Sequence, residues 1–173
     1  KHQKIDIIHS NNFIAARAAL EKISPEIIIY LTLKEKFERA YQNNLHLNIC
    51  FDQNQGAQYV FTNSVNCYKI SNFYTKKVFG DFYKKNLLLT LAETYKGLHK
   101  LDVVRSINTN NPKAVAEAIK KVNRIYYADY IMAWKSVQNH FTMIQAETLD
   151  KLQRVLTYSS KVTSPQRYII KLI

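Results

Sequence analysis

Residues 112–141, PKAVAEAIKKVNRIYYADYIMAWKSVQNHF, decide the fold, because they have the strongest helical period in the chain and contain its one tryptophan. Pro112 suits the first turn of a helix, where its missing N–H loses no hydrogen bond, and Asn110 or Asn111 can cap that turn. Apolar residues then recur at steps of three and four: Val115, Ile119, Val122, Tyr126, Tyr130, Ala133, Val137 and Phe141. This spacing predicts one helix of roughly 45 Å.

A second apolar line on this predicted helix widens its buried stripe. It consists of Ile125, Ile131 and Trp134. We therefore expect the helix to be covered on more than one side. Asp129 lies among these aromatic residues, where a carboxylate needs a hydrogen-bonding partner. The segment is predicted to be the central helix of a mainly helical domain.

Helices are also predicted on both sides of this segment. We expect them over 13–23, from Ser24-Pro25 to about Tyr41, from a Thr75 cap through Leu98, over Gln145–Ser159, and over 166–173. The residues expected near one face of the helix that starts at Ser24-Pro25 are Ile27, Tyr30, Leu31, Lys34, Phe37 and Ala40. The predicted inner face of the Gln145–Ser159 helix comprises Leu149, Leu152, Val155, Leu156 and Ser159. Gly80, inside the Thr75 helix, is interpreted as a close packing contact. With only 3 glycines and 3 prolines, the chain is expected to form a single helical domain over residues 1–173, or a fragment of a larger chain.

Residues 45–71 have a different pattern. LHLNICF places Leu45, Leu47, Ile49 and Phe51 opposite His46, Asn48 and Cys50, which is the period of a half-buried strand. DQNQG at 52–56 predicts a turn, and AQYVFTNS and VNCYKIS predict two further short strands. The predicted fold class is therefore mainly α (α+β), with a small antiparallel sheet of two or three strands. Cys50 and Cys67 are either buried apolar thiols or, in an oxidising compartment, one disulfide.

The search for chemistry yields no catalytic, cofactor or metal constellation. The histidines are scattered, and none has metal-ligand spacing to another His, Cys or carboxylate. Asp129 could be a buried acid with a shifted pKa. We favour a structural carboxylate, hydrogen-bonded to a backbone or tyrosine partner across the core.

The net charge of +12 raises the alternative of a basic nucleic-acid-binding domain. No run of like charges is longer than two residues, which favours a solvated lysine-rich surface. The best basic-aromatic patch joins four lysines to three aromatics: Lys76, Lys77, Lys84, Lys85, Phe79, Phe82 and Tyr83. Aromatics at helical spacing more often form core, so we expect the lysines to be its wet rim. The longest apolar runs fall far short of the ~20 residues that cross a bilayer.

The order of these motifs resembles the IcmF-type inner-membrane subunit of type VI secretion systems, in its periplasmic region. That family typically shows Tyr-x-x-Asp-Tyr followed by Trp on a long helix, and a Ser-Pro pair opening a later helix. It also shows a hydrophobic-Thr start to an earlier helix with a following aromatic. The corresponding residues here are Tyr126, Asp129, Tyr130, Trp134, Ser164, Pro165, Tyr74, Thr75 and Phe79. Val78 and Tyr95 depart from the usual glycine and tryptophan, which indicates a divergent member.

The resemblance implies a non-enzymatic scaffold without a cofactor, in the periplasmic part of a membrane-anchored protein. The implied partners are other subunits of the secretion membrane complex: an outer-membrane lipoprotein, a second inner-membrane subunit and further copies of the same protein. No nucleic acid is implied. The residues of the motif would then form structural core and would take part in no reaction.

Overall fold

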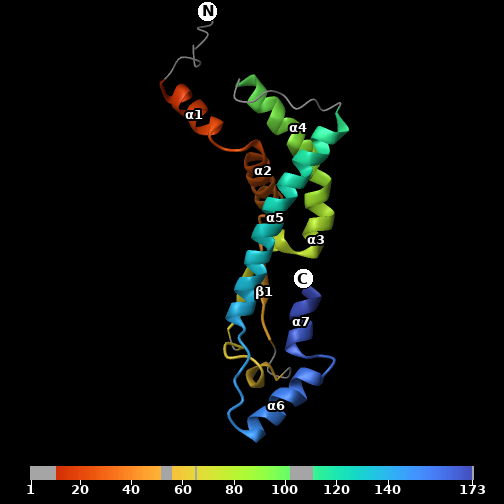
Figure 1. The fold of residues 1–173 in the computed structure, drawn as a ribbon. Coiled ribbons are helices and arrows are strands. Elements are labelled where there is room, and N and C mark those ends of the chain that lie inside the picture. The colour runs from red at the N-terminus through yellow and green to blue at the C-terminus, as the bar shows by residue number, and fades with distance from the viewer. Residues whose placement is uncertain (1–10, 52–55, 65, 102–110, 173) are drawn as a thin grey trace, which may run out of the picture. The chain divides into compact units, whose positions relative to one another are not determined.

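The computed structural model describes residues 11–51, 56–64, 66–101 and 111–172, with the side chains of 11–13 excepted. As predicted, the fold is mainly α with a small antiparallel sheet (Figure 1). The helices are α1 (Asn11–Glu21), α2 (Pro25–Ala40), α3 (Lys76–Val78), α4 (Lys84–Lys100), α5 (Pro112–His140), α6 (Leu149–Ser160) and α7 (Pro165–Leu172). The strands are β1 (His46–Ile49) and β2 (Tyr68–Ser71), and short 3₁₀ turns occupy η3 (Ala57–Tyr59) and η4 (Asn72–Tyr74).

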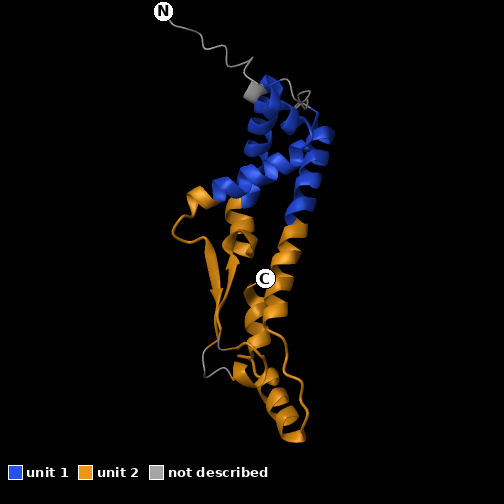
Figure 2. Cartoon of the chain, turned by 90° about the vertical axis from the view of Figure 1, so that its left-hand side faces the viewer, with its two compact units in different colours: residues 1–37, 83–126 blue, residues 38–82, 127–173 orange. Residues whose placement is uncertain are grey.

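The chain divides into two compact units, coloured in Figure 2. Unit 1 comprises residues 1–37 and 83–126, and unit 2 comprises residues 38–82 and 127–173. Each unit is described separately below. The single domain expected over residues 1–173 stays a prediction.

Unit 1 is packed from helices. Its buried apolar side chains are Ile29, Tyr30, Leu33, Phe37, Tyr83, Leu87, Leu91, Tyr95, Leu98, Ala118, Val122 and Tyr126. The inner face predicted for α2 is partly wrong: Leu31 is 54% exposed, whereas Ile29 and Leu33 are buried. The run EIIIYL is apolar around the whole helix, so its period does not indicate which side faces the core.

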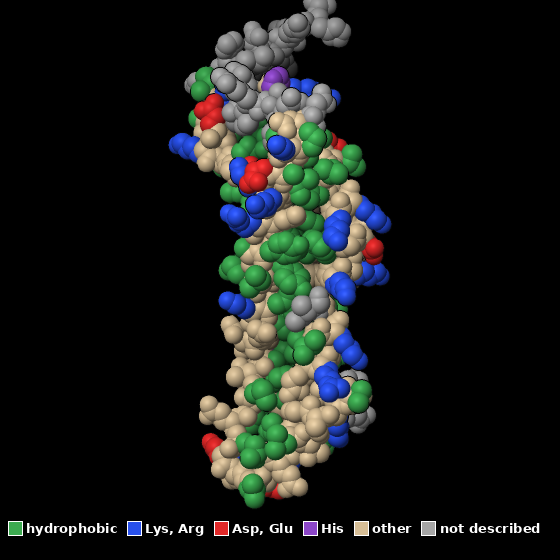
Figure 3. All heavy atoms as spheres, turned by 45° about the vertical axis from the view of Figure 1, so that its right-hand side comes forward, with side chains coloured by type: hydrophobic (Ala, Val, Ile, Leu, Met, Phe, Trp, Pro, Cys, Tyr) green, Lys and Arg blue, Asp and Glu red, His purple; other side chains and the backbone are tan. Residues whose placement is uncertain are grey.

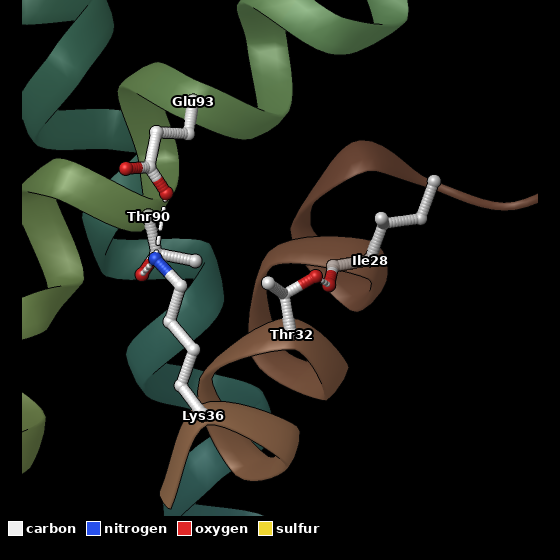
Figure 4. Close-up of polar contacts among 5 residues, drawn as sticks. All are labelled: Ile28, Thr32, Lys36, Thr90 and Glu93. Atoms are coloured by element: carbon white, nitrogen blue, oxygen red, sulfur yellow. Dashed lines mark hydrogen bonds and ion pairs between the residues drawn. The ribbon is translucent and has the colours of Figure 1, made fainter. Parts of the chain in front are cut away.

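Polar contacts link the helices of unit 1. Figure 4 shows Lys36 of α2 reaching α4, where its Nζ donates to Thr90 Oγ1 at 3.1 Å and to Glu93 Oε2 at 2.6 Å. In the same view Thr32 Oγ1 donates to the Ile28 carbonyl one turn back, at 2.8 Å. Thr90 is buried, whereas the ion pair between Lys36 and Glu93 is partly exposed, where a single ion pair contributes little stability.

Tyrosines form further links inside unit 1. The Tyr83 hydroxyl donates to Asn123 Oδ1 of α5 at 3.0 Å, and the Tyr83 and Tyr126 rings lie 4.4 Å apart. Burial, and to a smaller extent the negative charge of Glu26, raise the pKa of Tyr95 from 10.0 to about 12. Both effects disfavour the charged phenolate, so Tyr95 is neutral in the folded protein.

Unit 2 contains the sheet. β1 and β2 pair antiparallel with Leu47 opposite Ile70 and Ile49 opposite Tyr68. The strand predicted from AQYVFTNS is wrong: this segment begins with the turn η3, and Phe61 alone forms an isolated bridge, with Met143. Gly56, at φ 65°, starts η3 in the left-handed region that glycine favours. The rest of the turn predicted over 52–56 lies outside the described residues.

Apolar and aromatic side chains form the core of unit 2. Its buried members are Ile49, Val60, Phe61, Ile70, Trp134, Val137, Phe141 and Ile169. Cys50 and Cys67 are joined by a disulfide, with their Cα atoms 4.5 Å apart. The sequence had left this pairing open. The bond fixes the residues that follow β1 to those that precede β2.

The helix expected from Thr75 through Leu98 is interrupted near its start. α3 is followed by a π-helical turn over Phe79–Tyr83 (η5), and only then does α4 begin. Gly80 lies in this π turn, and a Cβ placed there would meet no atom within 4 Å. The close contact expected at Gly80 is therefore wrong. A π turn inside a helix is rare and has no clear signal in a single sequence.

α5 begins at Pro112 as predicted. Asn111 caps it, its Oδ1 accepting from the backbone N–H of Lys113 at 3.1 Å. Asn110, the alternative cap, lies outside the described residues. The second apolar line is wrong at Ile131, whose side chain is 51% exposed, whereas Trp134 is buried.

The two C-terminal helices belong to unit 2. α6 begins at Leu149, later than predicted, because Thr148 caps it and accepts from the Lys151 N–H at 3.3 Å. Its predicted inner face is largely wrong: Val155 is buried, but Leu149 is 82% and Leu156 59% exposed. α7 begins at Pro165 with Ser164 at its cap, the Ser164 Oγ accepting from the Arg167 N–H at 3.4 Å.

Candidate functional site

Tyr74 is the point at which the motif residues of α5 meet the segment before α3. The Trp134 indole Nε1 donates to the Tyr74 carbonyl oxygen at 2.9 Å. The Tyr74 hydroxyl in turn donates to Asp129 Oδ2 at 3.3 Å. One residue therefore accepts from the tryptophan and donates to the aspartate. We call Tyr74, Asp129 and Trp134 the tyrosine anchor.

The backbone around Tyr74 is fixed by short-range polar contacts. Thr75 Oγ1 donates to the Asn72 carbonyl at 2.8 Å and accepts from the Val78 N–H at 3.5 Å. Asn72 Nδ2 donates to both the carbonyl and Oδ1 of Asn44, at 2.9 Å each. These bonds hold η4 in one conformation, so the Tyr74 carbonyl is already in place for the indole of Trp134.

Burial determines what the tyrosine anchor can do. The Trp134 side chain is 4% exposed, Tyr74 is buried, and Asp129 is half-buried. A buried indole N–H without an acceptor would be costly, and the Tyr74 carbonyl satisfies it. The Asp129 carboxylate accepts from a phenol, whereas the sequence had left a backbone group and a tyrosine open as its partner. The geometry is that of a structural hydrogen-bond network.

Three further motif residues, Tyr126, Tyr130 and Phe79, make ring contacts with neighbouring aromatic side chains. Tyr126 belongs to unit 1, where its ring lies 4.4 Å from that of Tyr83. Tyr130 is in unit 2, with its ring centroid 6.3 Å from that of Trp134, and desolvation raises the pKa of its phenol. Phe79 is half-buried, 6.0 Å from the ring of Tyr127.

Ser164 and Pro165 are buried at the start of α7. Ile169, one turn further along α7, packs into the core of unit 2 that also contains Trp134. The structure thus places the Ser-Pro pair and the anchor tryptophan in the same unit. It gives the Ser-Pro pair the role of starting and orienting a helix.

The predicted basic-aromatic patch is divided by burial. Phe82 and Tyr83 are buried, whereas Lys84 and Lys85 are exposed. Phe82 and Tyr83 are therefore core residues, whereas Phe79 is half-buried. On the face drawn in Figure 3, Lys and Arg side chains are scattered among polar and apolar ones without a continuous basic stripe.

Two pockets open on unit 2. One, of about 380 Å³, lies between η3 and α6 and is lined by Tyr59, Lys151 and Arg154 among others. Its charges are largely compensated, because Arg154 pairs with Asp150 at 3.1 Å and its guanidinium lies 5.8 Å from the Tyr59 ring centre.

The second pocket, of about 450 Å³, is lined by Leu47, Asn72, Thr75, Lys76, Lys77, Lys171 and Leu172. No sequence pattern indicates this pocket, because Lys171 and Lys76 are far apart along the chain. We call it the lysine pocket.

Within the ranges that the structure describes, no group of His, Cys, Asp and Glu is arranged to hold a metal ion. A separate search of the same residues finds no helix that is both long enough and apolar enough to span a bilayer.

Comparison with known families identifies the chain. Residues 9–173 match the family model described as "IcmF-related: Intracellular multiplication and human macrophage-killing". No curated protein and no solved structure gives a significant match. The matched range includes every residue of the tyrosine anchor, both cysteines and the Ser164-Pro165 pair. The chain belongs to the IcmF-related family.

Proposed function

We propose that this chain is a non-enzymatic scaffold module of a type VI secretion trans-envelope complex, in the periplasmic part of a membrane-anchored IcmF-like protein. Membership of the IcmF-related family associates it with secretion systems. The main structural support for a scaffold role is the tyrosine anchor. Its Trp134 and Asp129 both bind Tyr74, so the polar groups of the motif maintain the fold.

The disulfide supports the periplasmic location. Cys50 and Cys67 are bonded, and disulfides persist in oxidising compartments such as the bacterial periplasm, whereas the cytosol keeps thiols reduced. The proposed partners are the other subunits of the complex: the outer-membrane lipoprotein, a second inner-membrane subunit and further copies of the same protein. Family membership supports a place in a multi-subunit secretion complex.

Thiol trapping in intact cells tests the location. Cells producing the full-length protein are quenched with acid, alkylated before and after reduction, and analysed by mass spectrometry of the peptides that contain Cys50 and Cys67. The proposal expects both cysteines to be alkylated only after reduction. Alkylation of both thiols before reduction would show a reducing compartment and would contradict the periplasmic location.

Purification of the complex tests the scaffold role. The full-length protein is solubilised from membranes and affinity-purified, and the proteins recovered with it are identified. We expect the other secretion subunits with the wild type, and a reduced yield of them with Trp134→Ala, because the anchor maintains the fold. Recovery of no other secretion subunit with the wild type would contradict the proposal.

The nucleic-acid alternative makes a separate prediction. A protein that neutralises several phosphates loses affinity steeply between low and physiological salt. The alternative therefore expects titration with a generic duplex at low salt to show binding, whereas the scaffold proposal expects none. Tight, salt-sensitive binding would favour the alternative.

A further inference from the structure

We propose that the lysine pocket is a docking site for an acidic, leucine-bearing segment of a partner protein. The inference deepens the proposed function and rests on it, because it names one surface through which the scaffold would hold another subunit. It depends on Lys76, Lys77 and Lys171, which come from the two separate segments of unit 2 and line the same pocket.

Three lysines give the lysine pocket its positive charge. Lys76 and Lys77 follow the Thr75 cap, and Lys171 comes from the last turn of α7, yet all three amines line one pocket. Among the described residues that line it, none is acidic. Like charges gathered in one concavity repel each other, and an anionic ligand relieves that repulsion. The pocket therefore favours a carboxylate or a phosphate.

The polar groups deeper in the pocket are already occupied. Thr75 Oγ1 donates to the Asn72 carbonyl, and Asn72 Nδ2 donates to Asn44. The charged recognition therefore comes from the lysine amines. Lysine provides a point charge on a flexible stem, which suits carboxylates presented in varied geometries better than planar, bidentate recognition.

The apolar side chains that line the lysine pocket indicate which class of partner it can bind. Leu47 of β1 and Leu172 of α7 line the same pocket and are each half-buried, so they leave apolar surface beside the amines. A leucine of a partner would cover this surface while a neighbouring carboxylate meets the lysines. A volume of about 450 Å³ is within the ordinary range for a ligand pocket, and it suits a few side chains of a peptide.

A nucleic-acid ligand fits this lining less well. Single-stranded nucleic acid is held by aromatic side chains that stack on its bases, together with basic residues along the backbone. The described lining residues include no aromatic side chain and no arginine. Lysines beside leucines match an acidic amphipathic segment of a protein.

Fluorescence anisotropy tests the proposal on the 173-residue chain. The probe is a fluorescein-labelled peptide of alternating glutamate and leucine, and the comparison peptide alternates glutamine and leucine. Both are titrated at about 0.15 M salt, where long-range charge effects are screened. We expect the glutamate peptide to bind and the glutamine peptide to bind at least about tenfold more weakly, as expected when a close charge pair is lost.

Matched triple variants localise the binding. Lys76→Glu, Lys77→Glu and Lys171→Glu together should weaken the glutamate peptide by about tenfold or more. Lys85→Glu, Lys96→Glu and Lys120→Glu change the net charge equally at exposed positions of unit 1 and should weaken it by less than about twofold. Circular dichroism melting of both triples checks that they remain folded. If the pocket triple does not fold, the single variant Lys171→Glu replaces it, with an expected loss of about threefold.

Three outcomes would overturn the proposal. They are failure of the wild type to bind the glutamate peptide, equal weakening of binding by the two triples, and binding of a labelled oligothymidine that is lost in the pocket triple. The failure of the proposed function is a different result. If the pocket triple leaves peptide binding intact while the full-length protein still co-purifies with secretion subunits, only the pocket is wrong. If the wild type recovers no such subunits, the proposed function is wrong.

Discussion

In unit 1, apolar side chains buried between helices provide most of the packing, and polar links such as Lys36 to Glu93 lie at the margins. Unit 2 has a two-stranded sheet, a disulfide, a glycine-dependent turn and the tyrosine anchor. A two-stranded sheet is barely stable alone. Unit 2 also has helices and an apolar core, but individual cross-links join its segments, whereas the packing of unit 1 is distributed over many similar apolar contacts.

The largest effect is expected at the tyrosine anchor. Trp134→Ala removes a buried aromatic and leaves the Tyr74 carbonyl without the indole donor, so we expect unfolding to become easier by about 3–5 kcal/mol. The matched control is Ile131→Ala on the same helix, which should change stability by less than about 0.5 kcal/mol because Ile131 is exposed. Urea denaturation followed by circular dichroism measures both. Equal losses in the two variants would place Trp134 outside the core.

The disulfide should contribute the next largest effect. Cys50 and Cys67 are separated by 17 residues, and closing a loop of about this length stabilises the folded state by about 3 kcal/mol. Cys50→Ala with Cys67→Ala should lower the free energy of unfolding by that amount. Hydrogen exchange should show the loss in amides of unit 2, with unit 1 protected as before. A loss spread evenly over both units would contradict the contrast between them.

Alkaline pH should weaken unit 1 through Tyr95. Its folded pKa is raised from 10.0 to about 12, so above pH 10 the unfolded chain releases this proton while the folded protein keeps it. Stability is therefore lost as pH rises from about 10 to about 12, by roughly 2–3 kcal/mol at the top of this window. Tyr95→Phe should lose less over the same window than the wild type. Identical pH profiles would show that Tyr95 titrates normally.

Replacing two glycines by alanine should change the free energy of unfolding in opposite directions, by less than the changes described above. Gly56, in unit 2, has φ 65°, and a Cβ there would collide with the ring of Tyr158, so Gly56→Ala should destabilise by more than about 1 kcal/mol. Gly97, in α4 of unit 1, has open space around it, and Gly97→Ala should stabilise by about 0.5–1 kcal/mol. Thermal melting compares them. If both substitutions shifted the melting temperature in the same direction, the two units would not differ in their dependence on glycine.

The helices were predictable from sequence to the extent that their start signals were local. Pro112 with Asn111, Ser24-Pro25 and Ser164-Pro165 each mark a helix start, and α5, α2 and α7 begin there. Which face is buried was less predictable, because it depends on neighbours distant in the sequence. Leu149 and Leu156 have the spacing of an inner face, yet α6 contacts the rest of unit 2 through Val155 and the stacking of Tyr158 on Tyr59.

The sequence indicated which residues form the candidate site, but not which hydrogen bonds join them. The motif pointed to Asp129 and Trp134, and the partner expected for Asp129 was either a backbone group or a tyrosine, without a position. That the partner is Tyr74, and that the Tyr74 carbonyl also receives the indole, depends on how η4 approaches α5. The lysine pocket could not be foreseen at all, because the position of Lys171 beside Lys76 is set by tertiary packing.

The structural role of Asp129 is tested most directly by measuring secretion from cells whose full-length protein carries Asp129→Asn. The account holds that Asp129 serves as a structural acceptor for the Tyr74 hydroxyl, and asparagine keeps an acceptor oxygen at that place. It predicts secretion within about twofold of wild type and a melting temperature within about 4 °C of wild type, since exchanging a charged acceptor for a neutral one alters a hydrogen bond by only about 1 kcal/mol. Abolished secretion from a variant that folds, accumulates and melts like the wild type would show that the carboxylate itself is required, and would contradict the account.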